Sequence, residues 1–301
     1  HRLVEDITRL APEKVDHIGF IIHPSFGKQV EADLKQVAQE VGAIGKIFYQ
    51  EEAKGISHAL LFAGELFTGK VIVAFADTLF KANFKLDTSK DGIIWVQKVD
   101  DPKPFGVVKI DTNNIITDFV EKPQTFVSDL AIIGIYYFND GEYLKRELQY
   151  LLDNNIKEKG EFQLTNALEN MKAKGTKFHP GNVTEWLDCG NKDATVYTNQ
   201  RILELVRENE KLINPSAEMR NSKIIDPCFI GKDVLIINST IGPHVSIGKG
   251  CLIENSVITN SIIQNNSKLI NAALINSMVG NNVEFTGKST NASIGDFSTI
   301  K

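Results

Sequence analysis

The sequence predicts two domains of different architecture: an α/β domain over residues 1–210 and a left-handed parallel β-helix over residues 211–301. Two observations lead to this prediction. Short apolar runs alternate with amphipathic segments as far as about Arg207, which is typical of strands and helices packed in layers. After Pro215, aliphatic residues recur every six positions among Asn, Ser and Gly, which is the period of a β-helix built from hexapeptide repeats.

The α/β prediction rests on strand-like and helix-like segments that follow one another. Helical spacing of apolar residues appears within 1–10, 30–41 and 57–66, and strand-like runs cover 18–22, 46–50, 71–76 and 92–98. The last two runs are almost entirely apolar, as expected of strands that are buried on both faces. The alternation predicts a mostly parallel sheet with helices on both sides.

The middle of the chain departs from this alternation. Three strand-like runs, 105–110, 115–120 and 132–138, lie close together, and turn residues separate the first two. They predict an antiparallel insertion that could act as a lid over a substrate. Helical patterns then cover 142–152, 163–174 and 193–207, so we expect a long helix to close the first domain.

The β-helix prediction rests on one inward-facing aliphatic residue in each repeat. Ile241, Ile247 and Ile253 are six residues apart, and Phe229 and Leu235 extend the same phase upstream. Later turns look less regular, with aliphatic residues at Ile258, Ile263, Leu269, Ile275 and Val279. Small and polar residues between them fit the corners of a coil, and several coils must stack before the apolar column is buried.

Composition limits the classes of function. A formal net charge of −5 argues against a protein that binds nucleic acid by neutralising phosphates. No apolar run approaches the roughly 20 residues that a membrane span needs, and the chain does not open with a signal peptide. Cys189, Cys228 and Cys251 lack the spacing of a disulfide framework, so we expect reduced thiols and a cytoplasmic protein.

The start of the chain is unusual for such a domain. It begins with His1, and Leu3, Ile7 and Leu10 recur at helical spacing before the first strand-like run. A nucleotide-binding α/β domain normally begins with a strand and a glycine-rich turn. We therefore expect that an N-terminal strand and its glycine-rich loop are missing from this sequence.

Two aspartates follow short apolar runs and are candidate metal ligands. Asp77 follows the run 71–76, and Asp188 lies in Glu185-Trp186-Leu187-Asp188-Cys189-Gly190. Ligands of open α/β sheets bind beyond the carboxyl ends of the strands, and Mg²⁺ prefers one or two carboxylates together with phosphate oxygens. Either aspartate could instead cap the segment that follows it.

Two further segments carry groups that could bind a phosphorylated ligand. In Glu121-Lys122-Pro123, the lysine could pair with a phosphate and the glutamate could accept hydrogen bonds from sugar hydroxyls. The alternative is an exposed turn with an incidental ion pair. Between 50 and 59, the Gln50 amide could read a base edge and Gly55 could let a base approach the backbone. This segment could equally be a simple helix entry with Ser57 near the cap.

Taken in order, these segments resemble the sugar-1-phosphate nucleotidylyltransferases, which include thymidylyltransferases and guanylyltransferases that act on hexose 1-phosphates. The motifs that carry the resemblance span nearly all of residues 1–207: Gln50…Gly55 with His58-Ala59-Leu60, Phe75-Ala76-Asp77-Thr78, Pro104–Val108, Phe119–Pro123, Gly134–Tyr136, Gly160–Thr165 and Trp186–Gly190. The resemblance implies a Rossmann-like nucleotide-diphospho-sugar transferase domain with a mixed sheet. A β-helix tail also occurs in this family.

The resemblance implies a role for each candidate residue. Contacts to the nucleotide base would come from Gln50 and Gly55, and the Mg²⁺ ligands would be Asp77 and Asp188. The sugar-phosphate site would be formed by Gly106, Glu121, Lys122, Gly134 and Trp186.

The implied reaction transfers a nucleotidyl group from a nucleoside triphosphate to a hexose 1-phosphate and releases pyrophosphate. The metal and Lys122 would offset the repulsion between two polyanions, with Asp77 and Asp188 as the other catalytic groups. The family's triphosphate-binding glycine-rich loop is not found in this chain, so we expect the chain as given to be inactive or nearly so. The base and the sugar stay open.

Two other functions compete with this one. A non-catalytic regulatory or assembly homologue would keep the fold but would not need both aspartates and Lys122. A hexapeptide-repeat acyltransferase usually needs a basic residue at the edge of a coil, and His244 is the candidate in the tail, although a corner position would also explain it. The flat sides of a β-helix also predict a homo-oligomer.

Overall fold

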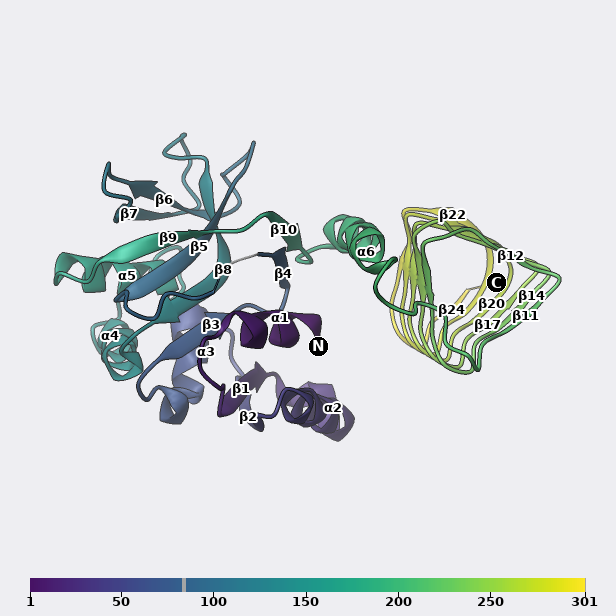
Figure 1. The fold of residues 1–301 in the computed structure, drawn as a ribbon, viewed down its shortest axis with the longest axis horizontal. Coiled ribbons are helices and arrows are strands. Elements are labelled where there is room, and N and C mark those ends of the chain that lie inside the picture. The colour runs from purple at the N-terminus through teal and green to yellow at the C-terminus, as the bar shows by residue number, and fades with distance from the viewer. Residues whose placement is uncertain (83–84, 301) are drawn as a thin grey trace. The chain divides into compact units, whose positions relative to one another are not determined.

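The computed structural model describes residues 1–82 and 85–300. The chain forms two compact units, His1–Trp186 and Leu187–Lys301 (Figure 1). The division lies before the helix α6 (Lys192–Val206), whereas the domain boundary expected from the sequence lies at residue 210. Each unit has its own apolar core and is described by itself.

The first unit alternates helices and strands. Its helices are α1 (Arg2–Leu10), α2 (Gly27–Glu40), α3 (Ile56–Phe62), α4 (Gly141–Asp153) and α5 (Leu164–Ala173), with 3₁₀ turns η1 (Pro24–Phe26) and η2 (Gly64–Leu66). Its strands are β1 (His17–Ile22), β2 (Ile44–Tyr49), β3 (Val71–Ala74), β4 (Thr78–Lys81), β5 (Gly92–Lys98), β6 (Gly106–Ile110), β7 (Ile116–Glu121), β8 (Leu130–Phe138) and β9 (Phe178–Asn182), and β10 (Glu185–Asp188) begins at its end.

The main sheet is built around β8. Its order is β7-β6-β8-β5-β9, and β3 also pairs with β8. The pairings of β8 with β3, β5 and β6 are all antiparallel, and only β5 and β9 pair in parallel. The expected mixed sheet is therefore confirmed, but the mostly parallel sheet expected from the β/α alternation is not.

The three strand-like runs do not form a separate insertion, and the expected lid stays a prediction for the β6–β7 hairpin alone. The run 132–138 lies within β8 at the centre of the sheet, where Tyr136, Tyr137 and Phe138 are buried. The hairpin of β6 and β7 continues the same sheet through the pairing of Val107 with Ala131. Close spacing of strands in the sequence indicates antiparallel neighbours correctly, but it cannot distinguish a flap from the middle of a sheet.

Two layers of helices bury the two faces of this sheet. Alternate residues of β5 point to opposite faces: Ile94 and Val96 join one core together with α3, α4 and α5, whereas Ile93 and Trp95 join another together with α1 and β4. Figure 1 shows α1 and the α4–α5 pair in these positions. The helical spacing seen at the start of the sequence is confirmed, because Leu10 is buried and Leu3 and Ile7 pack against the same core.

Two small sheets complete the first unit. β1 and β2 form a two-stranded parallel sheet, in register from the pair of His17 with Ile44 to the pair of Ile22 with Tyr49. The helix between them, α2, packs mainly on β2. β4 pairs with β10. β4 begins directly after Asp77.

The second unit contains α6 and a parallel β-helix. The coils are formed by short strands: β11 (Glu218–Arg220), β12 (Lys223–Ile224), β13 (Cys228–Ile230), β14 (Leu235–Ile237), β15 (Thr240–Ile241), β16 (Val245–Ile247), β17 (Leu252–Glu254), β18 (Val257–Thr259), β19 (Ile262–Ile263), β20 (Lys268–Ile275), β21 (Met278–Val279), β22 (Glu284–Thr290), β23 (Ser293–Ile294) and β24 (Thr299–Ile300). All their pairings are parallel.

The corners of the coil explain the wealth of asparagine. Each corner residue has a positive φ, a conformation that Asn tolerates better than most residues. One corner stacks Asn221, Asn238, Asn255 and Asn271, and a second stacks His244, Asn260, Asn276 and Asn291. The serine after a corner adds a bond between coils: the Ser222 hydroxyl accepts from the Ser239 N–H (3.1 Å), and the Ser239 hydroxyl accepts from the Ser256 N–H (3.0 Å).

Strict six-residue repeats would give coils of 18 residues, but the observed coils are shorter. Stacked partners are 17 residues apart at Asn221 and Asn238, 16 apart at Asn260 and Asn276, and 15 apart at Asn281 and Asp296. The expected phase therefore slips, and three residues that it placed inside point outward: Phe229 is 43% exposed, Ile275 is 46% exposed, and Leu235 is partly exposed. The buried residues are their neighbours Ile230, Leu274 and Ile236.

Helix α6 packs on one side of the β-helix. Asn199 donates to the main-chain oxygen of His244 (3.2 Å) and accepts from the Ser246 hydroxyl (2.5 Å). The His244 imidazole contacts the Glu204 carboxylate over 2.7 Å. None of the described helices is both long and apolar enough to cross a lipid bilayer.

Candidate functional site

Most of the candidate residues in the first unit gather along one edge of β8. At Tyr137, β8 has Ile72 of β3 on one side and Ile93 of β5 on the other. At Ala131 it has Val107 of β6 on one side and β5 again on the other. β3 and β6 therefore share an edge of β8, and the stretch Ile132–Gly134 lies between them. The turn after β3 and the start of β6 meet there.

Asp77 lies in the turn after β3, and main-chain oxygens of β8 hold both ends of that turn. The Phe75 N–H donates to the Gly134 oxygen (2.9 Å), and the Thr78 hydroxyl donates to the Ile133 oxygen (2.7 Å). Asp77 itself is exposed. Its carboxylate has no hydrogen bond or ion pair to the described residues, so it does not act as the cap that was the alternative explanation of this position.

Gly134 is required for this arrangement. Its φ is +83°, and a Cβ at this position would lie 2.7 Å from the Phe75 ring. Only glycine combines this backbone conformation with so close an approach. Gly134 therefore fixes the Asp77 turn against β8.

Glu121 ends β7 beside the start of β6. Gly106 and Glu121 are paired across the two strands, and a Cβ at Gly106 would lie 3.1 Å from the Glu121 carboxylate. The Thr165 hydroxyl of α5 donates to the same carboxylate (3.3 Å). The Glu121 side chain is only 12% exposed. Burial raises the pKa of Glu121, an effect that the charge of Lys122 opposes.

Lys122 and Trp186 are brought together by Phe105. The Lys122 N–H donates to the Phe105 oxygen (3.1 Å), and the rings of Phe105 and Trp186 meet edge to face at 4.9 Å. The Lys122 ammonium is half exposed and lies 4.0 Å from the Glu121 carboxylate. The Trp186 indole N–H is buried and has no hydrogen-bond partner in the described part of the chain, which leaves a donor for a ligand.

Lys159 is a functional candidate that the sequence reasoning missed. Its ammonium donates to the main-chain oxygens of Lys122 (2.9 Å) and Glu121 (3.3 Å). Lys122 has a φ of +43°, which is uncommon outside glycine and asparagine. Lys159 thus holds an unusual turn that carries two of the five predicted sugar-phosphate contacts, Glu121 and Lys122. The signal was present in the sequence, because Lys159 directly precedes the quoted motif Gly160–Thr165.

Gln50 and Gly55 lie in the loop between β2 and α3. The Gln50 N–H donates to the Ile22 oxygen (3.0 Å), which continues the pairing of β1 with β2. Gly55 has a φ of +105°, and a Cβ there would lie 2.6 Å from the Phe162 oxygen. The Phe162 N–H donates to Lys54 (2.9 Å) and its oxygen accepts from Ser57 (3.0 Å). Segment 159–165 therefore connects the Gly55 loop to the turn that carries Lys122.

Asp188 ends β10 and belongs to the second unit. Its carboxylate accepts from the Gly190 N–H (2.9 Å), and its main-chain oxygen accepts from the Thr198 hydroxyl (2.7 Å). The cap of α6 is Asn191 instead. No cluster of three or more His, Cys, Asp or Glu side chains suited to a metal occurs among the described residues. A magnesium ion that also binds phosphate oxygens needs only one or two carboxylates from the protein. The Asp77 carboxylate, which has no partner among the described residues, could be one of them.

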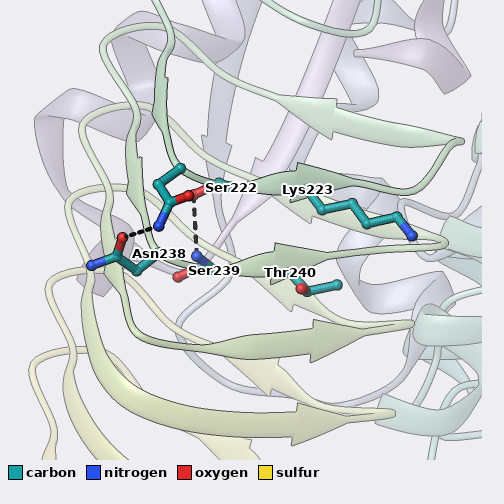
Figure 2. A pocket seen from close by; sticks show the side chains of 6 residues that line it. Ser222, Lys223, Asn238, Ser239 and Thr240 are labelled. Atoms are coloured by element: carbon teal, nitrogen blue, oxygen red, sulfur yellow. Dashed lines mark hydrogen bonds between the residues drawn. The ribbon is translucent and has the colours of Figure 1, made fainter.

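A hollow of about 440 Å³ lies elsewhere, on the β-helix, lined by Asn221, Ser222, Lys223, Asn238, Ser239 and Thr240. Figure 2 shows two bonds between successive coils at this hollow: the Asn221 amide donates to the Asn238 side-chain oxygen, and the Ser239 N–H donates to the Ser222 hydroxyl. These asparagine and serine groups stabilise the coil. His244 is likewise engaged, at a corner with a φ of +63° and bonded to Glu204.

Comparisons with known proteins agree with this arrangement. A family model described as nucleotidyl transferase matches residues 3–204. The chain is similar to a glucose-1-phosphate thymidylyltransferase from Streptomyces griseus, at 24% identity over 71% of this chain and 65% of that protein. A second glucose-1-phosphate thymidylyltransferase, from Streptomyces antibioticus, is 26% identical over 82% of this chain and 74% of its own length.

A solved structure supports the fold. The nucleoside-diphosphate-sugar pyrophosphorylase from Vibrio cholerae RC9 superposes with a TM-score of 0.52 at 19% identity, covering 60% of this chain and 80% of that one. The family match extends over well more than half of the chain and includes the candidate residues of the nucleotidyltransferase site, from Gln50 to Asp188, but not His244. The chain belongs to the nucleotidyl transferase family.

Proposed function

We propose that the protein transfers a nucleotidyl group from a nucleoside triphosphate to a hexose 1-phosphate and releases pyrophosphate. The observation that carries this proposal is that Lys122 lies beside the largely buried Glu121, which is paired with Gly106, while Phe105 contacts both Lys122 and Trp186. A cation next to a buried hydrogen-bond acceptor suits a ligand with both a phosphate and hydroxyl groups. The glycine leaves room for the sugar ring next to the carboxylate.

Each residue has a defined part in this proposal. Glu121 accepts hydrogen bonds from sugar hydroxyls, the Trp186 N–H donates to the sugar, and Lys122 pairs with its phosphate. Gln50 and Gly55 contact the base. A phosphate oxygen of the sugar attacks the α-phosphorus, and the bond from that phosphorus to the oxygen that bridges to the β-phosphorus breaks, so that pyrophosphate leaves. When bound by Asp77 and Asp188, Mg²⁺ would neutralise phosphate charge.

The first test measures pyrophosphate release by the full-length encoded protein with Mg²⁺, across the common nucleoside triphosphates and hexose 1-phosphates. We expect one pair of substrates to be preferred. Lys122→Met should lower kcat/KM for the sugar phosphate by about 10²-fold, since it removes a charge-assisted contact. Lys109→Met on β6, at an exposed lysine, is the matched control and should leave the rate unchanged.

Two further variants test the metal. Asp77→Asn and Asp188→Asn should each raise the Mg²⁺ concentration needed for half-maximal release, because an amide binds the cation more weakly than a carboxylate. A folded protein that releases no pyrophosphate with any substrate pair would favour the regulatory homologue instead.

A further inference from the structure

One flat side of the β-helix carries an outward pattern of side chains that the proposed function does not use. This side, which we call the β14 face, consists of β11, β14, β17 and the first halves of β20 and β22, followed by β24. The middle residues of its strands, Ile236, Ile253 and Leu269, are completely buried. Their neighbours on either side therefore point outward. Helix α6 packs against a different side, at β16.

The strand register arranges these outward residues in two rows across the coils. The first row is Glu218, Leu235, Leu252 and Lys268, each aligned with the next in the neighbouring strand. These four positions read acidic, apolar, apolar, basic, and the row continues with Glu284 on β22 and Thr299 on β24. Leu235 and Leu252 are partly exposed, while Glu218 and Lys268 are exposed, and Glu218 pairs with Arg220 of its own chain over 2.6 Å. The second row is Arg220, Ile237, Glu254 and Ile270.

The first four positions of this row are complementary to their own reverse, and Glu284 and Thr299 lie outside that contact. If a second copy faces this side with its coil order reversed, Leu235 lies opposite Leu252 and Glu218 lies opposite Lys268. A two-fold axis that runs parallel to the strands, between the coils of Leu235 and Leu252, would relate the two copies in this way. Each pair of facing residues would then occur twice in the contact. Such an isologous contact is the commonest kind in homodimers. In the second row, Arg220 comes within reach of Glu254 of the other copy.

We propose that the β14 face is a homodimer interface in which two β-helices pack face to face with their coils in opposite order. The occupant is a second copy of this chain, because the pattern of charges matches itself. The proposal does not depend on the proposed enzymatic function.

The size of the face sets the strength of the contact. Four strands of each copy face each other in this arrangement, and at about 4.8 Å between strands and about five residues of about 3.3 Å each they give roughly 300 Å² per copy. A standard stable interface needs about 800 Å² per partner. We therefore expect a weak, reversible dimer whose population rises with protein concentration and falls with salt, because exposed charge pairs contribute to it.

Sedimentation of the 301-residue chain over a wide range of protein concentration tests the proposal. The wild type should show a reversible monomer–dimer equilibrium. Leu252→Asn should weaken the dimer by about tenfold or more, because it places an amide at the centre of the apolar pair. Val257→Asn is the matched control: Val257 is 54% exposed on the neighbouring side of the coil, and the substitution should leave the dimer intact.

Charge reversal tests the pairing itself. Glu218→Lys and Lys268→Glu should each weaken the dimer, since like charges then face each other, and the double variant should restore it. Lys288→Glu, on another side of the coil, should have no effect. A strictly monomeric wild type, or a dimer that only Val257→Asn disrupts, would overturn the proposal. A dimer that the double variant fails to restore would overturn the reversed arrangement. Thermal unfolding of each variant separates loss of association from loss of fold.

Discussion

The ammonium of Lys159 donates a hydrogen bond to the main-chain oxygen of Lys122, over 2.9 Å. A second bond, of 3.3 Å, reaches the oxygen of Glu121. These two carbonyls belong to a turn in which Lys122 has a positive φ. A charged donor that bonds two successive carbonyls can hold such a turn in place.

Replacing Lys159 should therefore misplace the turn without unfolding the protein. Lys159→Met should lower kcat/KM for the sugar phosphate by about 10-fold to 100-fold, the range expected when a hydrogen bond to a charged group is lost. Lys159→Arg should recover part of the rate, since it keeps a charged donor. Steady-state kinetics of both variants check this, with Lys157→Met as a control nearby. Equal rates for Lys159→Met and the wild type would show that the turn holds by itself.

The ionised Glu121 carboxylate should support activity but lower the stability of the folded protein at neutral pH. Burial raises its pKa above the ordinary value, so its ionised form is less stable in the folded protein than in the unfolded chain. The stability that Glu121 contributes is present below the unfolded pKa and is lost as pH rises through the folded pKa. Glu121→Gln should then raise the melting temperature at neutral pH, with a difference that disappears in acid. It should also lower kcat/KM by about 10-fold or more.

Melting curves from acid to neutral pH check this expectation for Glu121→Gln. The control is Glu158→Gln, whose carboxylate is exposed and should give no such pH-dependent difference. If Glu121→Gln instead lowers the melting temperature at neutral pH, the bonds from Thr165 and the charge of Lys122 outweigh burial.

Gly134 offers a test of the Asp77 turn. Gly134→Ala adds a Cβ that would lie 2.7 Å from the Phe75 ring, at a φ of +83°. Gly160 has nearly the same backbone conformation, with a φ of +86°, but nothing lies within 4 Å of its added Cβ. Both variants should therefore carry about 1 kcal/mol of backbone strain. Only Gly134→Ala should add a steric cost, of about 1–3 kcal/mol.

Chemical denaturation measures this difference between the two glycine variants. Gly134→Ala should also weaken Mg²⁺-dependent activity, because Phe75 must shift and Asp77 lies two residues later. Equal destabilisation in both variants would mean that Phe75 moves aside without cost.

Glu204 should make the docking of α6 depend on pH. The hydrogen bond from His244 lowers the pKa of Glu204 below its ordinary value, with the charges of Arg207 and other basic groups adding to the effect. The stabilisation is therefore present above the unfolded pKa and is lost as pH falls through the folded pKa. Glu204→Gln should lower the melting temperature at neutral pH, with a difference that fades in acid. Glu208→Gln, at a side chain that is 80% exposed, is the control.

The sequence was most informative where one local rule decides the structure. Helical spacing identified α1 from Leu3, Ile7 and Leu10, and a strand signal identified β5 over its full length. The aliphatic repeat identified the β-helix. The repeat wrongly predicted that Phe229 and Leu235 face inward. Strict hexapeptides would give coils of 18 residues, whereas the coils observed here contain 15, 16 or 17 residues. The length of a coil depends on how its corners close, which the six-residue spacing does not show.

The candidate site shows a different limit. Gly106 pairs with Glu121, and Phe105 contacts both Lys122 and Trp186, but the part of these residues in binding a sugar phosphate stays a prediction. Lys159 directly precedes the motif Gly160–Thr165, but its contact with the Lys122 turn could not be predicted from the sequence, because it joins residues 37 positions apart. The central position of β8 was equally hidden, because antiparallel neighbours look the same in sequence at the edge and in the middle of a sheet.

The varying number of residues per coil has a consequence for how such a module can change in length. Each coil bonds only to the coils before and after it, so a whole turn can be duplicated or lost without disturbing distant turns. A single six-residue insertion would instead rotate every later corner by one side of the triangle and break the asparagine stacks. The gene segment for this region can therefore grow or shrink only in steps of a complete turn.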